Sequence, residues 1–104
     1  MVMKKKTINK KKISKECWDL DSAFLKWLKE HLIVYLKEAS KVVDLNWYKF
    51  QYKGEELTQE QIIKKILILL NSIEGKDFWD GEEYTSKCDE ILDLWKLVFH
   101  SMWW

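Results

Sequence analysis

Residues 57–73, LTQEQIIKKILILLNSI, contain the clearest structural signal in the chain. Thr58 is followed three residues later by Gln61, which is the spacing of a capping box at the start of a helix. The rest of the segment is apolar on nearly every side, so neighbours must cover it from several directions. We therefore predict a central helix over residues 59–73, ending near Gly75.

A second helix is predicted over residues 20–41, because apolar residues recur there at helical spacing. Asp21 or Asp19 is expected to cap its start. The apolar residues are Phe24, Trp27, Leu28, Leu32, Tyr35, Leu36 and Ala39. Lysines and glutamates occupy the other side, as on a helix with one face toward solvent.

A third helix is predicted over residues 81–103, beginning at a second capping box between Asp80 and Glu83. Its apolar residues are spaced alternately by four and three, which is the seam of a coiled-coil-like contact. The seam consists of Tyr84, Cys88, Ile91, Trp95, Val98 and Met102. The apolar surface exceeds what a three-helix monomer covers easily, so we expect a homo-oligomer with this helix at the contact.

The pattern changes between the first two helices, where residues 47–52 are predicted to be extended. Tyr48, Phe50 and Tyr52 alternate with polar residues, and Gly54 follows. A single strand leaves its backbone groups unpaired. The segment therefore pairs with another short segment, pairs across a dimer, or is an extended loop.

The fold class that follows is mainly α, a compact three-helix domain with one short extended aromatic segment. The domain is expected over residues 16–104, after a basic flexible tail at 1–15. The tail has seven of the eighteen lysines and no acid, whereas the domain has eleven lysines and seventeen carboxylates, a net charge of −6. No run resembles a signal peptide or a membrane span, so we expect a cytoplasmic protein with no membrane partner.

All eighteen basic residues are lysine, and arginine and proline are absent. Arginine makes bidentate contacts to guanine and phosphate, so a specific nucleic-acid partner is not expected. The basic tail would at most attach to phosphates nonspecifically, against the charge of the acidic domain. Cys17 and Cys88 form no CxxC motif, which indicates reduced thiols.

No constellation of residues indicates catalysis, a cofactor or a metal. The three glycines are isolated, so there is no phosphate-binding loop. His31 and His100 belong to different predicted helices, and neither has a second ligand at metal spacing. We expect a protein that is not an enzyme; cleavage of a nucleotide by one histidine and a carboxylate is the enzymatic alternative.

Seven tryptophans in 104 residues are the main indication of function. Several lie at helix ends or in loops, where their rings could form pockets that stack a nucleobase while nearby lysines meet a phosphate. Alternatively, they hold loops against a small core. The predicted ligand-binding residues are Trp18, Asp21, Trp47, Tyr48, Trp79, His100, Trp103 and Trp104.

Three segments taken together resemble a group of small, largely uncharacterised proteins from phages and prophages of Gram-positive bacteria. They are WDLDSAFLKWLKEHL (18–32), EELTQEQIIKKILILL (55–70) and LWKLVFHSMWW (94–104). The group has a WDxD-like helix start, an LT-x-E helix and a final helix with an LWW-like end. This chain departs from the pattern by lacking a proline before Glu56 and by having Ile62 in place of tryptophan.

The resemblance implies a phage accessory protein that acts by binding in the host cytoplasm. We expect it to sequester a nucleotide-type signal of host immunity in aromatic pockets and so to counteract host defence. The alternative is a protein–protein inhibitor or adaptor that binds a host protein through exposed Trp103 and Trp104.

Overall fold

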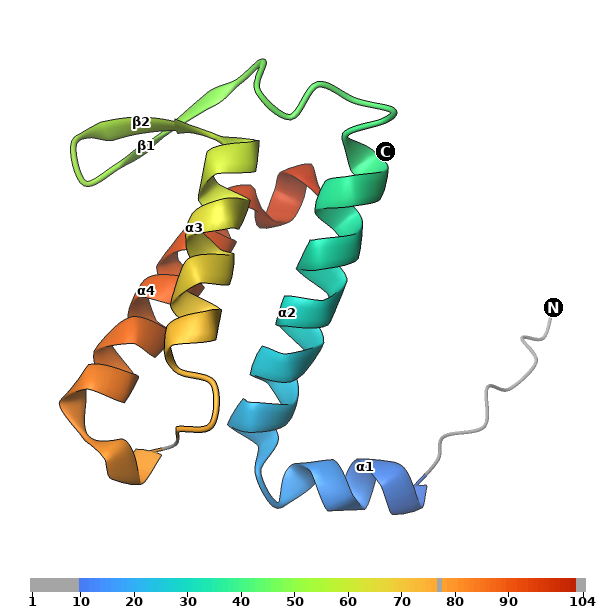
Figure 1. The fold of residues 1–104 in the computed structure, drawn as a ribbon, viewed down its shortest axis with the longest axis vertical. Helices are drawn as coiled ribbons and strands as arrows, with labels where there is room; N and C mark the ends of the chain where they lie inside the picture. The colour runs from blue at the N-terminus through green and yellow to red at the C-terminus, as the bar shows by residue number, and fades with distance from the viewer. Residues whose placement is uncertain (1–9, 77, 103–104) are drawn as a thin grey trace, which may run out of the picture.

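The computed structural model describes residues 10–76 and 78–102. This part of the chain forms four α-helices, two short 3₁₀ helices and two strands (Figure 1). In chain order they are α1 (Lys10–Cys17), α2 (Leu20–Ala39), β1 (Lys49–Tyr52), β2 (Glu55–Thr58), α3 (Gln59–Ser72), η1 (Phe78–Asp80), α4 (Glu82–Val98) and η2 (Phe99–Ser101). The prediction of a mainly α fold is confirmed.

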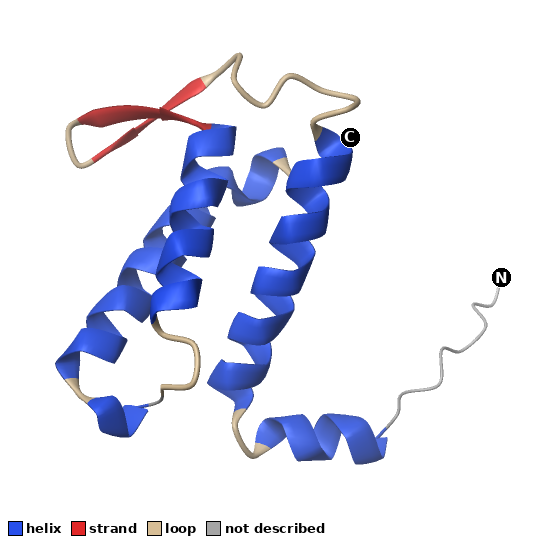
Figure 2. Cartoon of the chain, viewed as in Figure 1, coloured by secondary structure: helices blue, strands red, loops and turns tan. Residues whose placement is uncertain are grey.

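Helices α2, α3 and α4 form an antiparallel bundle in which α3 packs against both of the others. α1 lies across the start of α2 and projects from the bundle, while the β-hairpin projects at the opposite end (Figures 1 and 2). We call the two extremities the α1 end (residues 10–22, 73–76 and 78–84) and the hairpin end (residues 40–60 and 97–102). The bundle thus separates two surfaces that are distant from each other.

The hydrophobic core is centred on α3, as its apolar sequence predicts. Ile62, Ile63 and Ile66 are completely buried. They pack against fully or almost fully buried residues of the flanking helices, which are Leu28, Leu32, Ile91, Leu94 and Val98. Burying a side chain of this size stabilises a fold by about 1.5–3 kcal/mol, so this cluster is the main source of stability.

The predicted capping box at the start of α3 is present. The Gln61 amide N–H donates to Thr58 Oγ1 at 3.3 Å, and the Thr58 amide N–H donates to Gln61 Oε1 at 2.8 Å. Two amide groups that no helical carbonyl could reach are satisfied in this way. α3 consequently begins at Gln59, where the sequence predicts it.

Residues 49–52 of the predicted extended segment 47–52 form one strand of a hairpin, whereas residues 47 and 48 precede the strand. β1 pairs with β2 in antiparallel register, with Phe50 opposite Leu57. Lys53 and Gly54 connect the strands and both have positive φ angles, 49° and 79°, as a two-residue turn of this hand requires. Pairing within one chain therefore decides among the three alternatives left open by the sequence.

Two predicted helix boundaries are wrong at the N-terminal side of the chain. Regular structure begins at Lys10 rather than near Cys17, because α1 forms within the lysine-rich segment expected to be a flexible tail. Residues 1–9 of that tail lie outside the described part of the chain. The predicted helix 20–41 ends at Ala39. With α1, the described residues contain four α-helices instead of three.

The third predicted helix also differs from α4. Gly81, rather than Asp80, occupies the N-cap position, so the capping box predicted to start at Asp80 is wrong. α4 ends at Val98 and continues as η2. Residues 99–102 of the predicted range 81–103 therefore lie beyond α4, and Trp103 and Trp104 are outside the described residues.

The coiled-coil-like seam of α4 faces the core of its own chain. Tyr84, Ile91 and Val98 are buried, and the other seam residues, Cys88, Trp95 and Met102, pack against the same core. The seam predicted for an oligomer contact is thus already covered by α2 and α3. Homo-oligomerisation stays a prediction, and it would have to use the exposed flank of the helix around Leu92 and Phe99.

Candidate functional site

The structure divides the predicted ligand-binding residues between the two ends of the bundle. Trp18, Asp21 and Trp79 lie at the α1 end, whereas the hairpin end contains Trp47, Tyr48 and His100. Trp103 and Trp104 lie outside the described residues. The six described residues of this set therefore do not surround one site within a single chain, and each end is a separate candidate site.

At the hairpin end, Trp47, Tyr48 and Phe50 form a continuous group of rings, which we call the hairpin aromatic cluster. The ring centroids of Trp47 and Tyr48 are 6.0 Å apart, and Tyr48 meets Phe50 edge to face at 4.9 Å. Phe50 packs on the core, but Trp47 is 78% exposed. The cluster thus leads from the core to a tryptophan in solvent.

Asn46 fixes the backbone immediately before this tryptophan. Its side-chain oxygen accepts a 2.7 Å bond from the Thr58 hydroxyl, and its side-chain amide donates to Glu60 Oε1 at 2.8 Å. The Glu60 amide N–H donates to the Leu45 carbonyl at 3.2 Å. The loop is therefore attached to the first turn of α3, and Trp47 is exposed on a supported backbone rather than at the tip of a free loop.

The carboxylate of Glu60 strengthens this attachment. Lys64 donates to it at 2.8 Å, and the hydrogen bonds from Lys64 and then from Asn46 lower the pKa of Glu60 below its ordinary value. Glu60 is therefore ionised at neutral pH, and the bond that it accepts from Asn46 is charge-assisted.

A side-chain hydrogen bond joins the hairpin to α4. The Tyr52 hydroxyl donates to Glu90 Oε2 at 3.2 Å, and Lys53 Nζ lies 5.2 Å from the centre of the Tyr52 ring. Burial is the main cause that raises the pKa of Tyr52, so its hydroxyl keeps its proton and remains a donor. The hairpin is thus anchored to α3 on one side and to α4 on the other.

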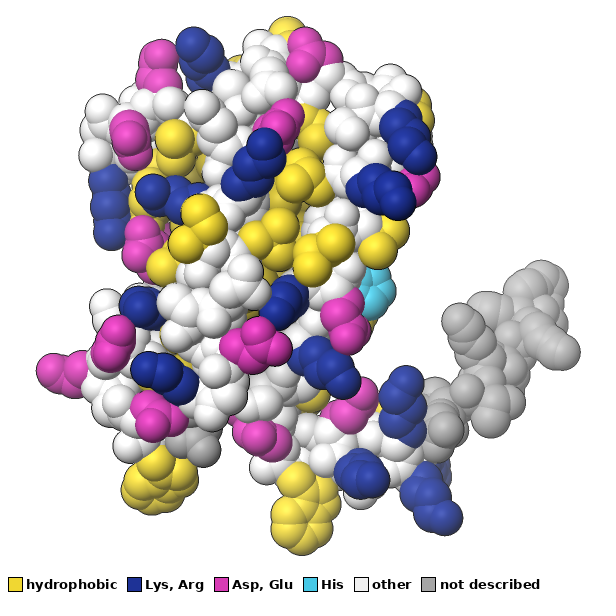
Figure 3. All heavy atoms as spheres, viewed as in Figure 1, with side chains coloured by type: hydrophobic (Ala, Val, Ile, Leu, Met, Phe, Trp, Pro, Cys, Tyr) yellow, Lys and Arg dark blue, Asp and Glu magenta, His cyan; other side chains and the backbone are white. Residues whose placement is uncertain are grey.

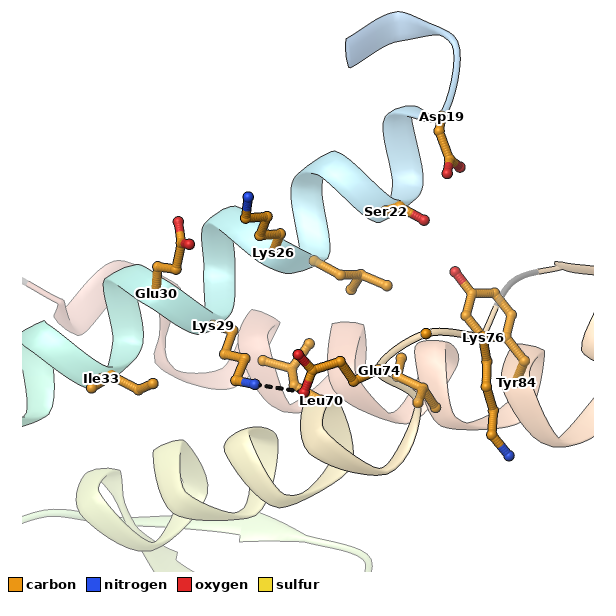
Figure 4. A pocket seen from close by; sticks show the side chains of 13 residues that line it. Asp19, Ser22, Lys26, Lys29, Glu30, Ile33, Leu70, Glu74, Lys76 and Tyr84 are labelled. Carbon is orange, nitrogen blue, oxygen red and sulfur yellow. Dashed lines mark hydrogen bonds and ion pairs between the residues drawn. The ribbon is translucent and has the colours of Figure 1, made fainter.

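A groove of about 480 Å³ lies between α2 and the C-terminal part of α3, near the α1 end (Figure 4). Its apolar lining consists of Leu25, Ile33, Leu70 and Ile73. The charged lining consists of Asp19, Lys26, Lys29, Glu30, Glu74 and Lys76. Among the described residues of the lining, positive and negative groups are equal in number, so this part of the groove has no strong preference for one sign of charge.

One ion pair crosses this groove. Lys29 reaches from α2 to Glu74 at 2.8 Å, whereas Lys26 and Glu30 point away from α3 (Figure 4). Within residues 10–76 and 78–102, Tyr84 is the one aromatic residue that lines the groove. The groove therefore resembles a mixed-charge cleft more closely than an aromatic box.

Tyr84 closes the groove at the α1 end. Its hydroxyl donates to Asp21 Oδ2 at 2.8 Å. Burial, followed by this carboxylate, raises the pKa of Tyr84 far above its ordinary value, while the hydrogen bond lowers the pKa of Asp21. Asp21 is thus a structural acceptor in the first turn of α2, and Asp19 occupies the N-cap position without a side-chain capping bond.

The histidines and the partly buried cysteine have structural environments. His31 Nδ1–H donates to the Trp27 carbonyl at 2.8 Å, and its ring stacks on Trp27 with centroids 4.2 Å apart. His100 is exposed on η2 and meets Phe99 edge to face at 5.3 Å. Burial raises the pKa of the Cys88 thiol, which keeps it protonated and weakly nucleophilic.

Within residues 10–76 and 78–102, no three histidine, cysteine, aspartate or glutamate side chains are placed to hold a metal ion. Over the same ranges, none of the helices has both the length and the apolar character needed to cross a bilayer.

Comparison with known proteins found no matching family model, no matching curated protein and no matching solved structure. The resemblance to phage proteins therefore stays a prediction, and functional inference depends on the surfaces of this chain.

Sequence reasoning missed the residues that support the hairpin aromatic cluster. Asn46 and Asp44 are two positions apart, and the Asn46 amide N–H donates to Asp44 Oδ1 at 2.9 Å. That spacing is typical of an Asx turn and could have indicated an ordered loop before Trp47. The contact between Asn46 and Glu60 joins residues fourteen positions apart, and no local pattern indicates it.

Proposed function

We propose that the protein is a binding protein without catalytic activity, which recognises a protein partner through the hairpin aromatic cluster. The observation that carries the proposal is that Trp47 is 78% exposed although Asn46 fixes the adjoining backbone. Tryptophan contributes most strongly to protein interfaces when it is buried at their centre. A pre-positioned tryptophan also loses little conformational freedom on binding, which favours affinity.

The hairpin offers a second element of recognition beside the rings. In the described part of the chain the sheet has two strands, so each strand has one edge that no other strand covers. An extended peptide can add to such an edge through main-chain hydrogen bonds. The partner would therefore present an extended segment together with an apolar pocket for Trp47.

The role expected of such a protein follows from its resemblance to small phage proteins. A protein of that kind would inhibit or redirect a host protein, as the inhibitor or adaptor alternative from the sequence states. The contact proposed here uses Trp47 and Tyr48, in place of the C-terminal tryptophans that lie outside the described residues.

The test is a comparison of protein partners captured from the lysate of a Gram-positive bacterium by the full chain and its variants. Trp47→Ala should lose the specific partner, because truncating an interface tryptophan costs 2 kcal/mol or more, about thirtyfold in affinity. Asn46→Ala should weaken capture while leaving the tryptophan in place. Trp18→Ala is the matched control, since it removes another strongly exposed tryptophan, at the α1 end.

The result is read by titrating the captured partner, once identified, against each variant whose helical circular dichroism is unchanged. Equal affinity of Trp47→Ala and the unmodified chain would reject the proposal. A partner lost by Trp18→Ala and kept by Trp47→Ala would place the protein interface at the α1 end instead.

A second function, sequestration of a nucleotide-type ligand, is favoured by the groove between α2 and α3. Its volume of about 480 Å³ lies within the range of small-molecule sites. Lys29 and Lys76, which line the groove, would meet phosphate oxygens. Binding there would remove a host immune signal without turnover. We rank this function second, because the described lining has as many carboxylates as lysines and contains no tryptophan.

Thermal unfolding with mono-, di- and cyclic nucleotides and ADP-ribose derivatives tests the second function. A ligand at one hundred times its dissociation constant stabilises by about 2.7 kcal/mol, or several degrees in a domain of this size. Lys29→Ala should remove the shift, and Lys49→Ala, at the hairpin end, should keep it. Recovery of unaltered ligand would indicate sequestration, recovery of altered ligand would indicate an enzyme, and no shift would reject both.

A further inference from the structure

Helix α1 has a charge pattern unlike that of the rest of the chain. It contains Lys10, Lys11, Lys12 and Lys15 against a single acid, Glu16. Every residue of α1 is exposed. The chain after α1 is acidic, since residues 18–104 carry sixteen carboxylates and eleven lysines. The molecule is therefore polarised, with positive charge concentrated on a helix that projects from the bundle.

The same segment exposes large apolar side chains. Ile13 and Cys17 are four positions apart and so share one face of α1. Ile13 is 44% exposed, Trp18 is 88% exposed and Leu20 is 61% exposed. Three large apolar side chains thus meet solvent within eight consecutive residues, next to the lysines.

Figure 3 shows this combination on the surface. Lysines gather along α1, and large hydrophobic side chains protrude from the same extremity of the molecule, below the α1–α2 junction and η1. An isolated helix of this length is marginal in water, because helix nucleation is unfavourable. A surface that takes up the apolar side chains and pairs with the lysines would stabilise α1.

We propose that α1 and Trp18 dock onto the interfacial region of an anionic lipid bilayer. Tryptophan is enriched at the level of the lipid headgroups, where its ring and its N–H are both accommodated. A basic amphipathic helix lies in that plane with its apolar side chains toward the acyl chains. The lysines are attracted to anionic headgroups, and the acidic bundle is oriented away from them.

Charge complementarity alone would also allow a nucleic acid, but the apolar side chains favour lipid. A polyanion in water neutralises lysines and provides no apolar phase for Ile13 or Leu20. The interface of an anionic bilayer neutralises the lysines and also provides an apolar phase for these side chains. The sequence predicts no membrane partner, because it lacks a segment that could span a bilayer. Attachment of α1 to the surface of a bilayer needs no such segment.

Trp79 lies at the same end and is 87% exposed, but its surroundings differ. Asp80, Glu82 and Glu83 follow it closely in sequence, and η1 and the start of α4 position them nearby. Carboxylates oppose an anionic surface, so we assign the contact to Trp18 and α1. Replacing Trp79 should weaken lipid binding less than replacing Trp18.

The experiment is flotation of the full chain with vesicles of phosphatidylcholine alone or with about 30% phosphatidylserine, a fraction that supplies the negative surface potential. The protein should float with the anionic vesicles at low salt and much less at about 0.5 M salt, which shortens the screening length. Trp18→Ala should weaken binding about tenfold, the effect of losing one buried apolar side chain. Trp47→Ala is the matched control and should bind as the unmodified chain does.

A variant that replaces Lys10, Lys11, Lys12 and Lys15 with glutamine should lose the preference for phosphatidylserine. α1 contributes nothing to the buried core, so its variants should keep the helical circular dichroism of the bundle. Unchanged vesicle binding by both the Trp18 and the lysine variants would overturn the proposal. Binding to a single-stranded oligonucleotide without binding to vesicles would also overturn it, in favour of a polyanion site.

This inference is independent of the proposed protein partner. Trp18→Ala should weaken flotation and keep the captured protein, whereas Trp47→Ala should lose the captured protein and keep flotation. Failure of one function therefore leaves the other testable.

Discussion

The Tyr84 hydroxyl donates a 2.8 Å hydrogen bond to a carboxylate oxygen of Asp21, although the two residues are 63 positions apart. The bond joins the first turn of α4 to the first turn of α2. Both helices pack against α3, so the bond closes the bundle at the α1 end. At the hairpin end, Gln59 of α3 joins α2 to η2 in a similar way. Its side-chain amide donates to Tyr35 Oη at 3.2 Å and to the Ser101 carbonyl at 3.5 Å.

Removing the Tyr84 hydroxyl should destabilise the fold. Tyr84→Phe keeps the buried ring and loses the bond to Asp21, which is charge-assisted but partly screened because Asp21 is exposed. We expect a loss of about 1 kcal/mol in the free energy of unfolding, measured by urea denaturation. Tyr48→Phe, whose ring is more than half exposed, is the control and should change little.

The same bond should appear in the pH dependence of stability. The folded-state pKa of Asp21 is lowered, chiefly by the Tyr84 hydroxyl, so its contribution is present above the unfolded-state value near 3.8 and is lost as pH falls through the folded value. The folded-state pKa of Tyr84 is raised, so its contribution is present below the unfolded value near 10 and falls as pH rises beyond it. Tyr84→Phe should therefore flatten both limbs of the curve of unfolding free energy against pH. Parallel curves for the variant and the unmodified chain would contradict this assignment.

The two cysteines should react with a thiol reagent at different rates. Cys17 is exposed on α1, whereas Cys88 is partly buried and its thiol has a raised pKa because of that burial. Since the thiolate is the reacting species, we expect Cys88 to react at least about tenfold more slowly in the native protein. Ellman's reagent followed with time should show two phases, of which Cys17→Ser removes the fast one and Cys88→Ser the slow one. A single phase, or the reverse assignment, would show that the environment of Cys88 is described wrongly.

Thr58 should be among the most sensitive polar residues. Its hydroxyl accepts from the Gln61 amide N–H and donates to Asn46, so Thr58→Ala removes both the helix cap and the support of the loop before Trp47. We expect a loss of about 1–2 kcal/mol, at the upper part of the range for N-caps. Thr85→Ala is the matched control, because that exposed hydroxyl donates only to the Gly81 carbonyl and its removal should cost less. Equal losses in the two variants, measured by thermal unfolding, would rule out the double role of Thr58.

The elements that local patterns determine were predictable. The capping box and the apolar run of α3 lie within one short segment, and the helix begins at the expected residue. β2 was missed because Glu55 and Glu56 are poor strand formers. Its pairing depends on the turn at Lys53 and Gly54, a weaker signal than asparagine followed by glycine. α1 was missed because closely spaced lysines repel one another and conceal the apolar pair on its other side.

The distribution of the site residues was partly predictable. Trp18, Trp47 and Trp79 were assigned to positions outside the core stripes, and all three are strongly exposed. In an antiparallel bundle, the starts of α2 and α4 share one end and the end of α2 lies at the other. Element order alone therefore separates Trp47 from the other two, and a pocket formed by all three could have been excluded. The bonds that hold Asn46 in place depend on tertiary packing and could not be predicted.

The junction of β2 and α3 has a mechanical consequence. Thr58 is both the last residue of the strand and the cap of the helix, so no flexible linker separates the two elements. A pull applied to the hairpin would load the first turn of α3 directly, without slack to absorb the extension. Under force the hairpin should thus not peel away by itself, and its rupture should coincide with rupture of the whole bundle.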